Sequence, residues 1–258
     1  MYKLTEGTVY KPSRRDFLRT TAIAGSAALV CWFSPRAFVE TALAGTPSAE
    51  ADSFIPRPVK PGTFSYFTST EIAFLDAVAS RLIPADTLGP GAHEAGVALF
   101  IDQQMAGSYG RAETWYMQGP WQEGSAEQGY QLVLTPAQLY RTAIRNLNDY
   151  CQQAFAKRSF AELDAENQDA ILHQLEQGKL QLPEVPAKEF FVMLLQNTVE
   201  GFLADPLYGG NRDFIGWKLI GFPGPRYNYS NEIEHYGKPY TLPTVGLLGR
   251  AGLPVRHG

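Results

Sequence analysis

Apolar residues recur at helical spacing along most of the chain after about residue 65. Between Thr68 and Pro84 these positions are Ile72, Leu75, Val78, Ala79 and Leu82. A spacing of about 3.6 residues predicts an amphipathic helix that ends before the proline. A second apolar segment runs from Ala92 to Met105, and we expect it to pack against the first.

A third helix is predicted from its start signal. Thr135, Pro136 and Gln138 stand at the positions of the N-cap and of the first and third helical residues, and each residue type is favoured at its place. The apolar positions that follow are Leu139, Ala143, Leu147, Tyr150 and Phe155.

Two more helices complete the expected set. One holds Phe160, Leu163, Ile171, Leu172 and Leu175, with Asp164 as a cap and Gly178 as the stop. The last long helix opens at Pro186 and holds Phe190, Phe191, Met193, Leu194, Val199 and Phe202. No stretch alternates as a strand does, so we predict an all-α domain of about five helices.

The segment Gly107–Gln131, the aromatic loop, has no sustained period. It carries Tyr109, Trp115, Tyr116, Trp121 and Tyr130 among glycines and prolines. Long loops in compact domains are usually functional or disordered, and the aromatic content argues against disorder. We interpret it as a partner-contacting loop acting through Tyr109, Trp115 and Trp121. A surface loop packed on itself is the alternative.

The segment Asp205–Tyr229, the C-terminal aromatic segment, least resembles an ordinary core. Its five glycines and three prolines preclude a long helix, and its rigid aromatic side chains are of the kind that anchor interfaces. We interpret residues 205–258 as an irregular interface tail, in which Trp217 is best suited to fill a partner pocket. The aromatic residues could instead cap the chain's own helical core. The candidate contacts are Tyr208, Gly209, Gly210, Asn211, Trp217, Gly221, Phe222, Pro223, Gly224 and Tyr227.

Within this segment, the run GGNRDFIGWKLIGFPGPRY resembles the C-terminal signature of the gluconate 2-dehydrogenase subunit 3 family. The resemblance extends back to Phe67 through YGRAETWYMQGPW, residues 109–121. That family comprises the small subunits of membrane-associated, FAD-dependent sugar and sugar-acid dehydrogenases of the bacterial periplasm.

The resemblance implies a heterotrimer. A flavoprotein large subunit of the glucose–methanol–choline oxidoreductase type would hold FAD and the catalytic base, and a multihaem cytochrome c subunit would pass electrons to ubiquinone. This chain would escort and stabilise the flavoprotein and would touch the membrane only through the complex. The resemblance leaves the substrate open among gluconate, sorbitol, fructose, 2-ketogluconate and glucose.

The N-terminus carries a twin-arginine export motif, SRRDFL, in which the key residues are Arg14, Arg15, Phe17 and Leu18. An apolar run and a small-residue cleavage site at Ala42 and Ala44 follow. The run is shorter than the roughly 20 residues of a membrane span. We therefore expect a signal peptide at 1–44, an extended Pro-rich linker at 45–67 and the helical domain at 68–258.

Cleavage after Ala44 changes both the charge and the cysteine content. The removed segment has six basic and three acidic residues, or +3, so the net charge moves from −4 to −4 − 3 = −7. Such a charge disfavours nucleic acid and anionic membrane surfaces as partners. Cys31 is removed as well, which leaves Cys151 as a single, buried, apolar residue.

Motifs of known cofactor chemistry are missing. The sequence has no GxGxxG after a strand, no CxxCH, no cysteine cluster and no HExxH. His93, His173, His235 and His257 are scattered, and the spacing of Asp102, Glu113 and Glu123 does not require a carboxylate pair. We assign no catalytic, cofactor-binding or metal-binding residue and expect FAD and haem c in partner subunits. A free-standing periplasmic enzyme and a scaffold protein unrelated to flavoenzymes are the alternatives.

Overall fold

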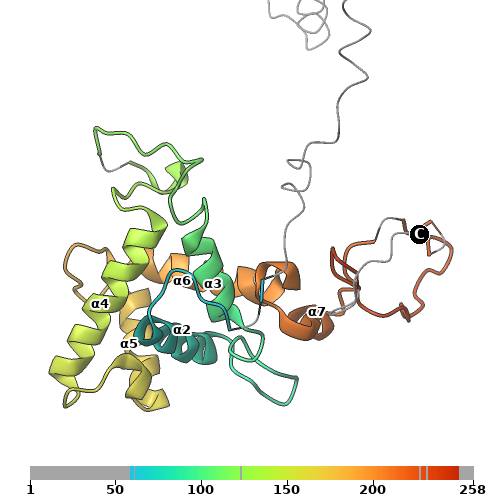
Figure 1. Ribbon diagram of the computed structural model, residues 1–258, viewed down its shortest axis with the longest axis horizontal. Coiled ribbons are helices and arrows are strands. Elements are labelled where there is room, and N and C mark those ends of the chain that lie inside the picture. Colours follow the sequence, from blue (N-terminus) through green and yellow to red (C-terminus); the bar gives the residue numbers. More distant parts are fainter. Residues whose placement is uncertain (1–58, 61, 123, 227, 231, 250–258) are drawn as a thin grey trace, which may run out of the picture. The chain divides into compact units, whose positions relative to one another are not determined.

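The computed structural model describes residues 59–249 apart from 61, 123, 227 and 231 (Figure 1). The predicted export motif, the cleavage site and most of the predicted linker lie outside these residues. The described helices belong to one compact unit, Pro56–Gly258.

The described residues form six α-helices and no strand, which confirms the all-α prediction. The helices are α2 (Ser69–Leu82), α3 (Val97–Ala106), α4 (Pro136–Ala154), α5 (Ala165–Glu176), α6 (Ala187–Leu203) and α7 (Ile215–Ile220). Five correspond to the predicted helices. The sixth, α7, is a short helix inside the C-terminal aromatic segment.

The predicted start signals act as caps. The side chain of Thr68 accepts a hydrogen bond from the backbone N–H of Glu71, and Thr135 does the same for Gln138. Asp164 caps α5 by accepting from Asn167 N–H. Each cap satisfies a backbone donor that a helix start would otherwise leave unpaired.

Two elements begin later than the apolar pattern does. Helix α3 begins at Val97, within the apolar segment from Ala92 to Met105, because Gly96 has φ +76° and the preceding residues form turns. Phe160 belongs to a separate 3-10 turn, η3 (Phe160–Glu162), which ends before the Asp164 cap.

The core lies between the five longer helices, with α6 packed against α3, α4 and α5. Its largest fully buried side chains include Phe74, Tyr140, Phe160 and Phe190. Phe74 packs on Phe160 at 4.9 Å between ring centroids, and Tyr140 meets Phe190 edge to face at 5.4 Å. Each buried aromatic ring of this kind contributes about 1.5–3 kcal/mol through the hydrophobic effect.

Glycines bring the C-terminal aromatic segment against the end of α6. A Cβ on Gly210 would lie 2.1 Å from the carbonyl oxygen of Gly201, and one on Gly216 would lie 2.1 Å from that of Phe202. Both positions therefore exclude any side chain, and the segment lies directly on the last turn of α6.

Candidate partner interface

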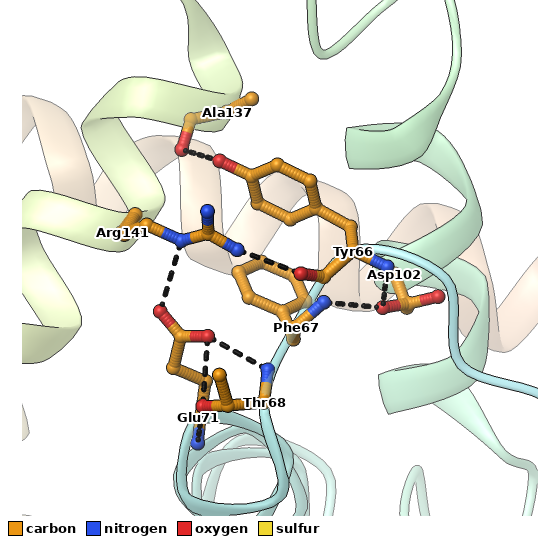
Figure 2. A network of polar contacts seen from close by, with 7 residues as sticks. All are labelled: Tyr66, Phe67, Thr68, Glu71, Asp102, Ala137 and Arg141. Atoms are coloured by element: carbon orange, nitrogen blue, oxygen red, sulfur yellow. Dashed lines mark hydrogen bonds and ion pairs between the residues drawn. The ribbon is translucent and has the colours of Figure 1, made fainter.

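Asp102 of α3 holds the chain that leads into α2 (Figure 2). Its fully buried carboxylate accepts hydrogen bonds from the backbone N–H groups of Ser65 (2.6 Å), Tyr66 (3.0 Å) and Phe67 (2.8 Å). A carboxylate that receives three backbone donors can be buried without another charge beside it. Asp102 therefore has a structural role.

Arg141 of α4 fastens the same stretch from the other side (Figure 2). Its guanidinium donates to the carbonyl of Tyr66 at 2.6 Å and to the Glu71 carboxylate at 3.2 Å, and it lies 4.1 Å above the Tyr66 ring. The Tyr66 hydroxyl donates to the carbonyl of Ala137 at 2.8 Å, and burial raises its pKa. The entry to α2 is thus tied to both α3 and α4.

The other groups considered for chemistry also have partners within the chain. Glu113 pairs with Arg111 at 2.6 Å, so Asp102 and Glu113 have separate partners, and Glu123 lies outside the described residues. His93 lies 3.1 Å from Asp76 and His173 lies 3.3 Å from Glu176, both on the surface.

Three further residues complete the set considered for chemistry. His235 is exposed, and His257 lies outside the described residues. Cys151 is fully buried, as predicted, and burial raises the pKa of its thiol to about 11. Such a thiol stays protonated at neutral pH and is a poor nucleophile.

A pocket of about 430 Å³ lies beside the start of α3. His93 and Asp76 line it as a pair, Glu94 accepts a hydrogen bond from Gly91 N–H at 2.9 Å, and the exposed Arg212 completes its charged groups. Within the part of the chain that the structure describes, no group of three or more His, Cys, Asp or Glu could hold a metal ion. Because the carboxylates already have partners, we assign no ligand to this pocket.

The aromatic loop is anchored from within. Trp115 lies between Tyr109 (5.4 Å) and Tyr130 (4.9 Å), measured between ring centroids. The Tyr109 hydroxyl accepts a hydrogen bond from the Asn197 amide at 3.2 Å, and the Tyr140 hydroxyl donates to the same amide at 2.8 Å. Burial raises the pKa of all three tyrosines.

Of the loop residues predicted to contact a partner, Tyr109 and Trp115 are half-buried against the chain's own core. Trp121 is 38% exposed, and its neighbour in the loop Tyr116 is 81% exposed. Partner contact through this loop stays a prediction.

The C-terminal aromatic segment is built around Asn211 and Trp217. The fully buried Asn211 amide donates to the carbonyl of Ala204 and accepts from Gly216 N–H, both at 2.8 Å. These bonds bridge the end of α6 and the start of α7.

Trp217 fills a pocket of its own chain. Its side chain is 6% exposed, and its indole N–H donates to the carbonyl of Leu203 at 2.7 Å. Phe214 stacks on its ring at 5.4 Å, and Phe222 meets the ring edge to face at 5.0 Å. Trp217 is therefore buried by its own chain, and its contact with a partner stays a prediction.

The other predicted contacts in this segment divide by exposure. Gly210, Asn211 and Gly224 are buried, whereas Gly209 and Pro223 are half-buried. Tyr208, Gly221 and Phe222 are exposed. Tyr227 lies outside the described residues. Partner contact through any of these residues stays a prediction.

Sequence reasoning missed an apolar surface on α6. Val192, Leu195 and Val199, the α6 stripe, are 54%, 38% and 42% exposed. Val199 was predicted among the apolar residues of this helix, and the structure places it on the outer face. The available signal was that α6 holds more apolar residues than one buried side accommodates.

Among the described residues, no helix has the length and apolarity needed to cross a lipid bilayer.

Comparison with protein families gives a match. Residues 69–224 match the family described as gluconate 2-dehydrogenase subunit 3. The match covers more than half of the chain, from the first residue of α2 to Gly224 after α7. A search of curated proteins and a search of solved structures each found no match.

Proposed function

The chain belongs to the gluconate 2-dehydrogenase subunit 3 family, and we propose that it is the small, non-catalytic subunit of a periplasmic, FAD-dependent gluconate 2-dehydrogenase. The family match is the observation that carries this proposal. It agrees with the resemblance carried by the C-terminal aromatic segment.

In this complex a flavoprotein subunit holds FAD and oxidises D-gluconate to 2-dehydro-D-gluconate. The two electrons leave through a multihaem cytochrome c subunit to ubiquinone. The contacts within this chain support a structural role for it in the complex. The polar side chains of Asp102, Arg141 and Asn211 all make hydrogen bonds that hold its own helices together.

We further propose that the chain takes the flavoprotein through the twin-arginine pathway and stabilises it in the periplasm, at the inner membrane. The support is the motif SRRDFL at residues 13–18. This pathway carries folded proteins, so a flavoprotein could receive FAD before export and leave the cytoplasm bound to this subunit.

The double variant Arg14→Lys, Arg15→Lys tests the escort role. We expect it to retain both this chain and the flavoprotein in the cytoplasm, so that periplasmic gluconate dehydrogenase activity is lost. Arg19→Lys, the same exchange outside the arginine pair, is the matched control and should leave activity unchanged. Normal periplasmic activity in the double variant would contradict the escort role.

A further inference from the structure

The outer face of α6 carries a row of three aliphatic side chains among exposed charged and polar ones. Val192, Leu195 and Val199 are spaced by three and four residues, so they lie in one row along the helix. The row begins at the exposed Lys188, four residues before Val192, and it continues to Leu203, which is half-buried and lies close to Gly216 of α7. The inner side of the same helix packs on α3, α4 and α5.

This row is suited to docking. Two of the three side chains in the row are valines. Valine is β-branched and has restricted χ1 freedom, so these two side chains lose little entropy when a partner covers them. A stable interface buries about 800 Å² on each partner, which is more than three side chains supply, so the α6 stripe would form its centre.

One edge of the stripe is acidic. Glu189, Gln196 and Glu200 follow one another at helical spacing beside the aliphatic row, and all three are exposed. The Glu200 carboxylate is held in place, since it accepts from the Gln196 amide at 2.8 Å and the Asn197 amide at 3.1 Å. A complementary surface therefore has basic residues along its corresponding edge.

The acidic edge argues against a second copy of this chain as the occupant. Antiparallel packing of two α6 stripes would bring the two acidic edges together, and like charges disfavour that arrangement. The chain as a whole also has a net charge of −4.

We propose that the α6 stripe is the surface through which this chain binds the flavoprotein subunit, which would present an aliphatic patch edged by lysine or arginine. This inference rests on the proposed function and locates the contact on the chain. It also places the centre of the contact outside the aromatic residues of the loop and the C-terminal segment.

The test compares two exposed valines. Val199→Asp puts a charge in the stripe, and Val133→Asp puts the same charge on a valine 60% exposed just before α4. The full-length chain and each variant are titrated against the purified flavin-containing dehydrogenase subunit. We expect Val199→Asp to weaken binding about 30-fold or more, as at interface hot spots, with the helix content and thermal melt of the lone chain unchanged. Val133→Asp should bind as the unaltered chain does.

A second variant tests the charge complementarity. Glu189→Lys should slow association with the flavoprotein subunit and reduce the salt dependence of its rate, because it removes an attraction at the rim.

Four outcomes would overturn the inference. Equal binding by Val199→Asp and the unaltered chain would place the contact elsewhere while leaving the proposed function standing. A lower melting temperature of lone Val199→Asp would mean that another part of this chain covers the stripe. A homodimer of the unaltered chain that Val199→Asp disperses would make a second copy the occupant. Failure of the unaltered chain to bind the flavoprotein would remove the proposed function as well.

Discussion

At the scale of single residues, the buried polar groups of this chain support its fold. Asp102 is the clearest case, because one carboxylate receives the backbone donors of three successive residues. Its place in the sequence, within an apolar helix, was compatible with a catalytic acid. The backbone N–H groups that Asp102 binds lie some 35 residues away in the chain, so the sequence did not show them. These partners favour a structural role over a catalytic one.

Asp102→Asn should lower the free energy of unfolding by about 2 kcal/mol, since hydrogen bonds to a charged acceptor are lost and a side-chain N–H₂ is turned toward backbone donors. Urea unfolding of the lone chain measures this. Glu113→Gln is the control, and the loss of its exposed pair with Arg111 should cost under about 1 kcal/mol. Equal effects of the two variants would argue against the role given to Asp102.

Trp217→Ala should destabilise the lone chain by about 3–5 kcal/mol, because it empties a buried site and removes the hydrogen bond to Leu203. Thermal unfolding reports the loss. Trp217→Phe keeps most of the packing and should cost less. A full loss of flavoprotein binding by Trp217→Ala with an unchanged melt would restore the interface interpretation.

At the scale of elements, a helix with a cap and apolar residues at helical spacing could be predicted from the sequence. Which of its sides is buried and which is exposed could not. A helix start can be predicted from its cap, because the cap side chain bonds to a backbone N–H only three residues further on. This holds for Thr68, Thr135 and Asp164. The start of α3 depends on Gly96, which has a positive φ and at which a side chain would meet the distant Gly209 and Arg212.

The same limit applies to the candidate interface. Trp217 and Val199 are both apolar, and an apolar side chain suits a core as well as a contact surface. Only the path of the folded chain decides which of the two residues its own chain covers. The glycines of the C-terminal aromatic segment correctly indicated close approach, but the sequence did not tell whether it was to α6 or to a partner.

One ion pair between elements gives a pH-dependent prediction. Arg81 of α2 donates two hydrogen bonds of 2.7 Å to Asp169 of α5, and they hold the pKa of this carboxyl below its ordinary value. A depressed pKa in the folded state contributes stability at neutral pH that is lost as the pH falls from about 4 through the folded-state pKa.

Asp169→Asn should therefore cost about 0.5–1 kcal/mol at neutral pH, a modest value because the pair is partly exposed to solvent. The difference from the unaltered chain should shrink as the pH is lowered below about 4. Urea unfolding over this pH range checks it, and Arg81→Gln should show the same trend. A difference independent of pH would rule out the ion pair as its source.

At the scale of the whole molecule, the chain is a helical unit whose family match ends where its packed fold ends. From α2 to Gly224 the family match follows the packed helices, and in the described residues after Gly224 no side chain is buried. The helical unit and the family match together describe a subunit of a gluconate 2-dehydrogenase family.

The most direct test of this account is to purify the full-length chain through an affinity tag from detergent-solubilised membranes and to measure its flavin content and gluconate oxidation, before and after separating the subunits. We expect equimolar FAD and gluconate-dependent reduction of a ubiquinone analogue in the intact complex, with both absent from the separated chain. A chain that purifies without a flavoprotein, or that keeps FAD or activity after separation, would contradict it.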